Sequence, residues 1–300
     1  MAAIVEVEHL AKSYGSFSAV EDVSFSVEDG EIFGILGPNG AGKTTTVECL
    51  QGLRRADGGA VRVLGHDPRH EANDLRKKIG SQLQESALPD RLKVWEALEL
   101  FSSLVPHGPH WEDVLEQWGL FEKRDAKFGS LSGGQQQRLF VALAVVNAPK
   151  LVFLDEMTTG LDPMSRRVTW ELIQQIRDSG STVVLVTHFM DEAEHLCDRI
   201  AVIDDKRVVA MDTPEGLIQT YAGGVEVTFS TDADDLGFLH QLQEVEGLSR
   251  EGRRATVSGS GALLARVAAA LVGNGLAPTD LAVRRANLED VFLTITGEER

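Results

Sequence analysis

The sequence predicts an α/β fold with an antiparallel β-subdomain and a helical insertion, followed by a small α+β domain. Short apolar runs of the kind found in buried strands alternate with segments of helical periodicity over most of the 300 residues. From about residue 85 to 147, helical segments are expected to follow one another without a strand. The pattern changes at Tyr221-Ala222-Gly223-Gly224, so we expect one domain over residues 1–222 and a second over residues 223–300.

The N-terminal segments predict the antiparallel part of the fold. Ile4 to Val7 and Val23 to Val27 alternate apolar and polar residues, as strands with one buried face do. Ala60 to Leu64 is expected to form another short strand between glycine-rich turns.

A phosphate-binding loop (P-loop) is predicted between the first buried strand, Ile32 to Leu36, and the helix that follows. The segment Gly37-Pro38-Asn39-Gly40-Ala41-Gly42-Lys43-Thr44-Thr45 fits the pattern G-x-x-x-x-G-K-[ST] at every fixed position. Glycines let successive backbone N–H groups turn towards a phosphate, and the helix N-terminus adds its positive dipole end. The alternative is a glycine-rich turn before an ordinary helix. Further candidate site residues in the second half of the sequence argue against this alternative. We therefore predict a P-loop NTPase core.

Three later segments carry further candidate site residues. The buried strand Lys150 to Leu154 is followed by Asp155 and Glu156, and the strand beginning at Thr182 ends in His188. Parallel strands present their carboxyl ends at one edge of the sheet, so these side chains are expected near the P-loop. Leu131-Ser132-Gly133-Gly134-Gln135 opens a helix, and Asp162 precedes another.

Together with Gln84, this set resembles the nucleotide-binding subunit of ATP-binding-cassette (ABC) transporters over about residues 4 to 220. The Leu-Ser-Gly-Gly-Gln segment between the P-loop and the acidic strand is specific to that family. The C-terminal segment Arg284 to Leu293 resembles the extension on the drug-exporting branch that includes daunorubicin-resistance ATPases. Met157 stands where the family usually has proline, which affects loop stiffness more than chemistry.

The resemblance implies that the chain binds ATP and Mg²⁺ and hydrolyses ATP. It implies that Tyr14 stacks on adenine and that Gly37, Pro38, Asn39, Gly40, Ala41, Gly42, Lys43, Thr44 and Thr45 surround the triphosphate. It assigns Mg²⁺ to Thr44, Gln84 and Asp155, activation of the attacking water to Glu156, and contact with the γ-phosphate to His188. It implies that Ser132, Gly133, Gly134 and Gln135 contact the nucleotide bound by a second cassette, and that Asp162 organises the dimer seam.

The implied partners are a second copy of this chain, or another cassette, and an integral membrane permease supplied by another chain. No apolar run approaches the roughly 18 residues that span a bilayer, so we expect the chain to bind at the cytoplasmic face of the membrane through that permease. A formal net charge of −17 argues against nucleic acid as a partner. Two rival functions are a soluble cassette protein acting on ribosomes or DNA, and an ATP-binding sensor without turnover.

The C-terminal domain is expected to have the element order β-α-β-β-α-β with a trailing helix, which is compatible with a ferredoxin-like sandwich. Its expected helices are Leu236 to Val245, Ala262 to Val272 and Leu288 to Ile295. Its expected core is Val225, Val227, Phe229, Leu239, Leu242, Val257, Leu263, Leu264, Leu271, Leu281 and Val283. We expect a regulatory or dimer-supporting role, the alternative being a passive stabilising cap.

Overall fold

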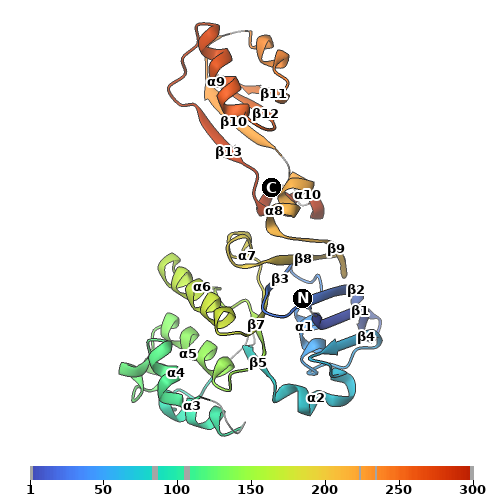
Figure 1. The fold of residues 1–300 in the computed structure, drawn as a ribbon, viewed down its shortest axis with the longest axis vertical. Helices are drawn as coiled ribbons and strands as arrows, with labels where there is room; N and C mark the ends of the chain where they lie inside the picture. The colour runs from blue at the N-terminus through green and yellow to red at the C-terminus, as the bar shows by residue number, and fades with distance from the viewer. Residues whose placement is uncertain (1–2, 83–86, 105–108, 223, 234, 298–300) are drawn as a thin grey trace. The chain divides into compact units, whose positions relative to one another are not determined.

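The structure is a computed structural model that describes residues 3–82, 87–104, 109–222, 224–233 and 235–297 (Figure 1). The chain divides into two compact units, Met1–Pro214 and Glu215–Arg300. The division precedes the expected boundary at residue 222 because Ile218–Ala222 (η3) packs against Leu288–Thr296 (α10) within the second unit. The functional division into residues 1–222 and 223–300 stays a prediction.

Within the described residues, the first unit is built on a nine-stranded sheet with the order β4-β1-β2-β9-β8-β3-β7-β6-β5. The neighbouring strands from β8 to β5 are parallel. The prediction of a buried strand from Ile32 to Leu36 is confirmed, since all five residues of β3 are buried. The remaining bounds are β4 Gly58–Val63, β1 Ala3–Tyr14, β2 Phe17–Glu28, β9 Arg207–Asp212, β8 Arg199–Asp204, β7 Thr182–Val186, β6 Leu151–Asp155 and β5 Ile79–Gln82.

The antiparallel strands β1 and β2 are confirmed, although both are longer than the sequence indicated. Val5 pairs with Val27 and Leu10 with Val23, so the apolar positions meet on one buried face. The register shifts several times along the pair. Each shift breaks the strict alternation of residues, which explains why the pattern was visible only over part of each strand.

Helices surround the parallel part of the sheet (Figure 1). As predicted, the described residues between β5 and β6 contain helices and no strand. The helix α2 (Pro68–Arg76) was not predicted, although Asp67 caps it by accepting a hydrogen bond from the Arg69 backbone N–H at 2.9 Å. The other helices of this unit are α1 Lys43–Leu50, α3 Val94–Ser102, α4 Trp111–Gln117, α5 Gly133–Val145, α6 Pro163–Asp178 and α7 Met190–Leu196.

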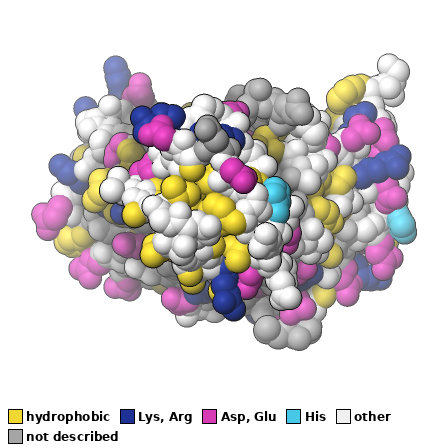
Figure 2. Space-filling model, turned by 90° about the horizontal axis from the view of Figure 1, so that it is seen from above, with side chains coloured by type: hydrophobic (Ala, Val, Ile, Leu, Met, Phe, Trp, Pro, Cys, Tyr) yellow, Lys and Arg dark blue, Asp and Glu magenta, His cyan; other side chains and the backbone are white. Residues whose placement is uncertain are grey.

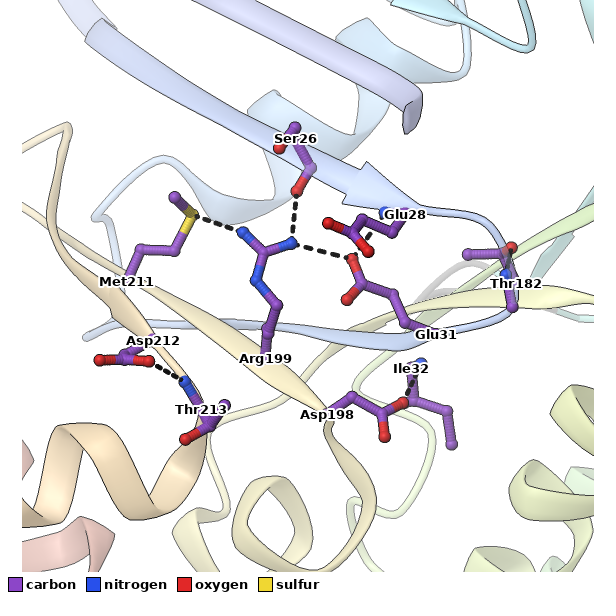
Figure 3. A network of polar contacts seen from close by, with 11 residues as sticks. Ser26, Glu28, Glu31, Ile32, Thr182, Asp198, Arg199, Met211, Asp212 and Thr213 are labelled. Carbon is purple, nitrogen blue, oxygen red and sulfur yellow. Dashed lines mark hydrogen bonds and ion pairs between the residues drawn. The ribbon is translucent and has the colours of Figure 1, made fainter. Parts of the chain in front are cut away.

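A polar network fixes the amino ends of two neighbouring strands, β3 and β8 (Figure 3). Glu31 precedes β3 and is only 7% exposed, and its Oε1 lies 3.3 Å from Arg199 Nη1 at the start of β8. Burial raises the pKa of the Glu31 carboxyl, which the Glu28 backbone N–H and the Arg199 charge oppose. This ion pair holds the end of the sheet opposite to the P-loop.

The second unit contains an antiparallel sheet with the order β11-β12-β10-β13. β12 therefore lies between β10 and β11, which is the split arrangement expected of a ferredoxin-like fold. The strands are β10 Val225–Ser230, β11 Val245–Glu251, β12 Arg254–Gly259 and β13 Ala282–Arg285. The helices α8 (Pro214–Leu217), α9 (Leu263–Gly273) and α10 complete the described part of this region.

One predicted element of this unit is wrong. Instead of a helix from Leu236 to Val245, the structure has a short 3-10 helix, Gly237–Gln241 (η4), and β11 begins at Val245. The Asp235 carboxylate accepts a hydrogen bond from the Gly237 N–H at 2.7 Å. This local bond competes with a regular helix start, and glycine at the first position adds a further penalty.

The second unit has its own core around Val227, Phe229, Leu239, Val257 and Leu271, as expected. Two expected core residues are exposed: Leu264 faces away from the sheet on α9, and Val283 lies on the edge strand β13. Among the described residues of the whole chain, no helix is long and apolar enough to cross a membrane.

Candidate functional site

The P-loop lies between β3 and α1, as predicted, and close backbone contacts require two of its glycines. Gly42 has φ 101°, and a Cβ there would overlap the Ala19 carbonyl oxygen. A Cβ on Gly37 would overlap the Ile203 carbonyl oxygen. The loop is therefore packed against β2 and β8 in a shape that only glycine at these positions allows.

Lys43 begins α1 and is 5% exposed. Its ammonium donates hydrogen bonds to the carbonyl oxygens of Gly37 at 2.8 Å and Pro38 at 3.0 Å. Burial lowers the pKa of Lys43, while the charges of Glu156 and Asp155 oppose that change. The lysine charge is thus held inside the loop and close to two carboxylates.

A cavity of about 290 Å³ lies over the loop. Its lining brings together residues from β2, the P-loop and the end of β6, namely Phe17, Ala19, Asn39, Gly40, Gly42, Lys43, Thr44, Thr45 and Glu156. The cavity combines hydroxyl groups and a buried ammonium, which suit phosphate oxygens, with a carboxylate and an exposed aromatic ring.

Asp155 is the last residue of β6 and is 2% exposed. Burial and the neighbouring Glu156 charge raise its pKa to about 6, although Lys43 acts in the opposite direction. Its Oδ1 has no hydrogen-bond partner among the described residues. A buried carboxylate oxygen without a partner is costly, and a cation would relieve that cost.

Glu156 follows directly in a strained backbone conformation, with φ 47°. Its N–H donates to the Val186 carbonyl at 2.9 Å, which ties the end of β6 to the end of β7. Glu156 Oε1 lies 3.3 Å from Nδ1 of His188, and the two side chains are 12% and 38% exposed. Left-handed backbone at a non-glycine residue is a recognised feature of functional sites.

The Leu-Ser-Gly-Gly-Gln segment and Asp162 lie outside the P-loop cavity. Ser132 and Gln135 form a reciprocal cap at the start of α5, with bonds of 3.4 and 3.0 Å. Asp162 caps α6 by accepting from the N–H groups of Met164 and Ser165 at 3.0 Å. None of Ser132, Gly133, Gly134, Gln135 and Asp162 lines the cavity as described.

The predicted residues Tyr14, Gly37, Pro38, Ala41, Asp155 and His188 are also not among the residues that line the cavity. Tyr14 is 42% exposed and lies beside the cations of Lys12 and Arg54, 5.3 and 6.0 Å from its ring centre. It does not line the cavity, whereas Phe17, its partner across the β1–β2 turn, does. The signal available in the sequence was a second aromatic residue directly after Gly15-Ser16, the turn that follows Tyr14. Gln84 lies outside the described residues.

The fold and the cavity define a nucleotide-binding ATPase domain, and comparison with known proteins specifies its family. The ABC transporter family matches residues 20–159. The chain is 37% identical over 305 positions to the daunorubicin resistance ATP-binding protein DrrA2 of Streptomyces coeruleorubidus, covering 98% of this chain and 95% of the relative. It is 38% identical to the Nod factor export ATP-binding protein I of Ralstonia nicotianae, covering 99% and 94%.

Solved structures of ATP-binding cassettes are similar in fold to this chain. An ATP-binding subunit of an ABC transporter superposes with a TM-score of 0.66 at 25% identity, covering 73% of this chain and 93% of that one. The ADP conformation of an ATP-binding cassette gives the same TM-score and identity, with 74% and 95% covered. The chain therefore belongs to the ABC transporter family. It is an ATP-binding transporter subunit, and its ATP hydrolysis is coupled to transport.

Proposed function

We propose that two copies of this chain close on two ATP molecules and thereby drive a membrane permease that exports a drug, an antibiotic or a lipid-like compound. The observation that carries this proposal is the shared cavity of the P-loop and Glu156, with His188 in contact with that carboxylate. The relatives named for daunorubicin resistance and Nod factor export support the direction of transport.

In this proposal the P-loop binds the triphosphate. Lys43 exchanges its two carbonyl partners for phosphate oxygens, so its ammonium keeps hydrogen-bond acceptors and gains charge attraction. The N–H groups of the loop and the N-terminus of α1 bind the remaining oxygens. Phe17 or Tyr14 supplies an aromatic surface for the base.

The residues fit Mg²⁺, because Asp155 offers a buried carboxylate oxygen without a described partner and Thr44 offers a hydroxyl in the lining of the cavity. These two groups, and Gln84, are the proposed ligands. Bound there, Mg²⁺ would neutralise negative charge on the phosphates. Glu156 accepts a proton from the attacking water, and His188 orients Glu156 and contacts the γ-phosphate.

The proposed dimer follows from the placement of Ser132 to Gln135. This segment begins a helix, has exposed polar groups and does not reach the cavity of its own chain. A helix N-terminus of this kind suits the γ-phosphate bound by another copy. Asp162, which caps the neighbouring helix α6, is the proposed partner at the same contact.

The test uses mixed dimers of two variants. Lys43→Ala weakens ATP binding in its own P-loop, while Ser132→Ala leaves binding intact and impairs the site of the partner copy. A Lys43→Ala copy joined to a Ser132→Ala copy retains one intact composite site, so it should hydrolyse ATP faster than either variant homodimer. Activity no higher than that of the homodimers contradicts the shared site.

A soluble cassette that acts on ribosomes or DNA is the rival function. Acidic and basic side chains are interspersed on the face that Figure 2 shows, without a continuous basic stripe, and the net charge is −17. Nucleic-acid binding depends on such a stripe. Co-purification with a permease rather than with ribosomes or DNA separates the two functions.

A further inference from the structure

A buried carboxylate behind the proposed catalytic pair has no assigned role. Glu192 lies on α7, four residues after His188, and is 0% exposed. Its Oε1 accepts a hydrogen bond from Trp170 Nε1 on α6 at 3.0 Å. Burial raises the pKa of the Glu192 carboxyl, and the hydroxyls of Thr187 and Thr158, together with Trp170, oppose that increase.

The groups around Glu192 come from three segments of the proposed site. Thr158 is in the loop that begins at Glu156, and Thr187 directly precedes His188. Trp170 lies on α6, the helix capped by Asp162. One buried side chain therefore contacts the loops of both proposed catalytic residues and the helix of the proposed dimer contact.

Hydrogen bonding in this cluster is incomplete. Glu192 Oε2 and Thr158 Oγ1 are both buried, and within the described part of the chain neither has a hydrogen-bond partner. An unpaired buried polar atom destabilises the folded state. The Thr158 hydroxyl is near enough to the Glu192 carboxyl to lower its pKa, so a hydrogen bond from Thr158 Oγ1 to Glu192 Oε2 would satisfy both atoms. The Thr187 hydroxyl already accepts a hydrogen bond from the Phe189 N–H at 3.0 Å, which fixes the His188 loop.

We propose that Glu192 is a positioning residue: it accepts hydrogen bonds from Thr158 and Thr187 during hydrolysis and so holds Glu156 and His188 in their working geometry. This inference rests on the proposed roles of Glu156 and His188. Glu192 touches neither ATP nor water in this scheme. Its effect is on turnover and not on the affinity for ATP.

The principal test compares two buried carboxylates. Glu192→Gln keeps the size of the side chain but replaces one acceptor by a donor, so kcat should fall about 10- to 100-fold, the range for a small misplacement of catalytic groups. KM and the Kd for ATP should change less than twofold. Glu31→Gln is the matched control, because Glu31 is also buried but lies at the other end of the sheet. Its kcat should stay within twofold of the unmodified protein.

A second pair of variants tests the coupling. Thr158→Val removes the hydroxyl and should lower kcat, whereas Thr158→Ser keeps the hydroxyl and should restore it. The double variant Glu192→Gln/Thr158→Val should be no slower than the slower single variant, because both remove the same interaction. If Glu192→Gln does not fold, the Val and Ser variants of Thr158 decide the question alone.

Three results would overturn the proposal: a kcat for Glu192→Gln within twofold of normal, an equal loss in Glu31→Gln, or equal kcat in the two Thr158 variants. Glu156→Gln and His188→Ala are measured beside them. Normal turnover in those two contradicts the proposed catalytic roles. Lost turnover in those two with normal turnover in Glu192→Gln contradicts only the role of Glu192.

Discussion

Glu156 Oε1 lies 3.3 Å from His188 Nδ1, across the carboxyl ends of the neighbouring parallel strands β6 and β7. The two residues are 32 positions apart in the sequence. The sheet brings them together because parallel neighbours end at the same edge. The Glu156 N–H bond to Val186 fixes their relative position further.

This contact makes the first prediction specific. Glu156→Gln keeps the shape of the side chain and removes its charge, so the attacking water loses its base. We expect ATP to bind with unchanged Kd while kcat falls by about 10²- to 10⁴-fold. Steady-state hydrolysis and binding of a fluorescent ATP analogue measure the two quantities. Near-normal turnover would exclude Glu156 as the base.

The second prediction concerns the base of the nucleotide. Because Phe17 lines the cavity and Tyr14 does not, Phe17→Ala should raise the Kd for ATP about threefold to tenfold, the loss of one stacked ring. Tyr14→Ala should have the smaller effect. Inorganic tripolyphosphate, which has no base, is the control ligand and should bind both variants equally well. A larger increase in Kd for Tyr14→Ala than for Phe17→Ala would indicate that Tyr14 stacks on the base.

The third prediction is the pH dependence of stability at the Arg199–Glu31 pair. The Glu31 pKa is raised in the folded state, so the folded state holds this proton more tightly than the unfolded state. The resulting contribution to stability is present at low pH and is lost as pH rises through the folded pKa. Arg199→Met removes a charge that opposes this shift. The variant should therefore lose more stability at about pH 7 than at about pH 4, by about 1–3 kcal/mol.

The control for that measurement is Arg207→Met. Arg207 pairs with Glu21 at 3.1 Å, but the two side chains are 60% and 35% exposed. An exposed pair contributes little and is screened by solvent. Thermal melting across this pH range should separate the two variants, and equal losses would show that the buried position of Glu31 is not the cause.

The fourth prediction concerns the second unit, whose core around Phe229 and Val257 is its own. A chain that ends at Pro214 should fold and bind ATP with near-native Kd, because every residue of the P-loop cavity precedes that position. It should dimerise less readily or couple poorly to the permease. Loss of ATP binding in a shortened chain that remains folded by circular dichroism would contradict the separation. Unchanged dimerisation and coupling would favour a passive cap.

The local elements of the site could be predicted from the sequence because each depends on neighbouring residues. The P-loop is recognised from the spacing of its glycines, lysine and threonine within Gly37 to Thr44 alone. The buried strand β3 before it is apolar at every position. Asp155 and Glu156 could be identified because two acids follow an apolar run. Each of these signals is contained in fewer than about ten consecutive residues, so no tertiary contact was needed to detect it.

Relations between distant residues were decided by the tertiary structure. Phe17 rather than Tyr14 lines the cavity because the turn between β1 and β2 directs the two rings to different neighbours. The helix expected from Leu236 to Val245 does not form. The Asp235 carboxylate accepts a hydrogen bond from the Gly237 N–H at its start, and β11 begins at Val245. The burial of Glu192, which lies on α7 and contacts Trp170 of α6, has no signature in the sequence around it. From the sequence, a carboxylate on a short polar helix is expected to be exposed. In the structure, the packing of α7 against α6 removes the Glu192 carboxylate from water.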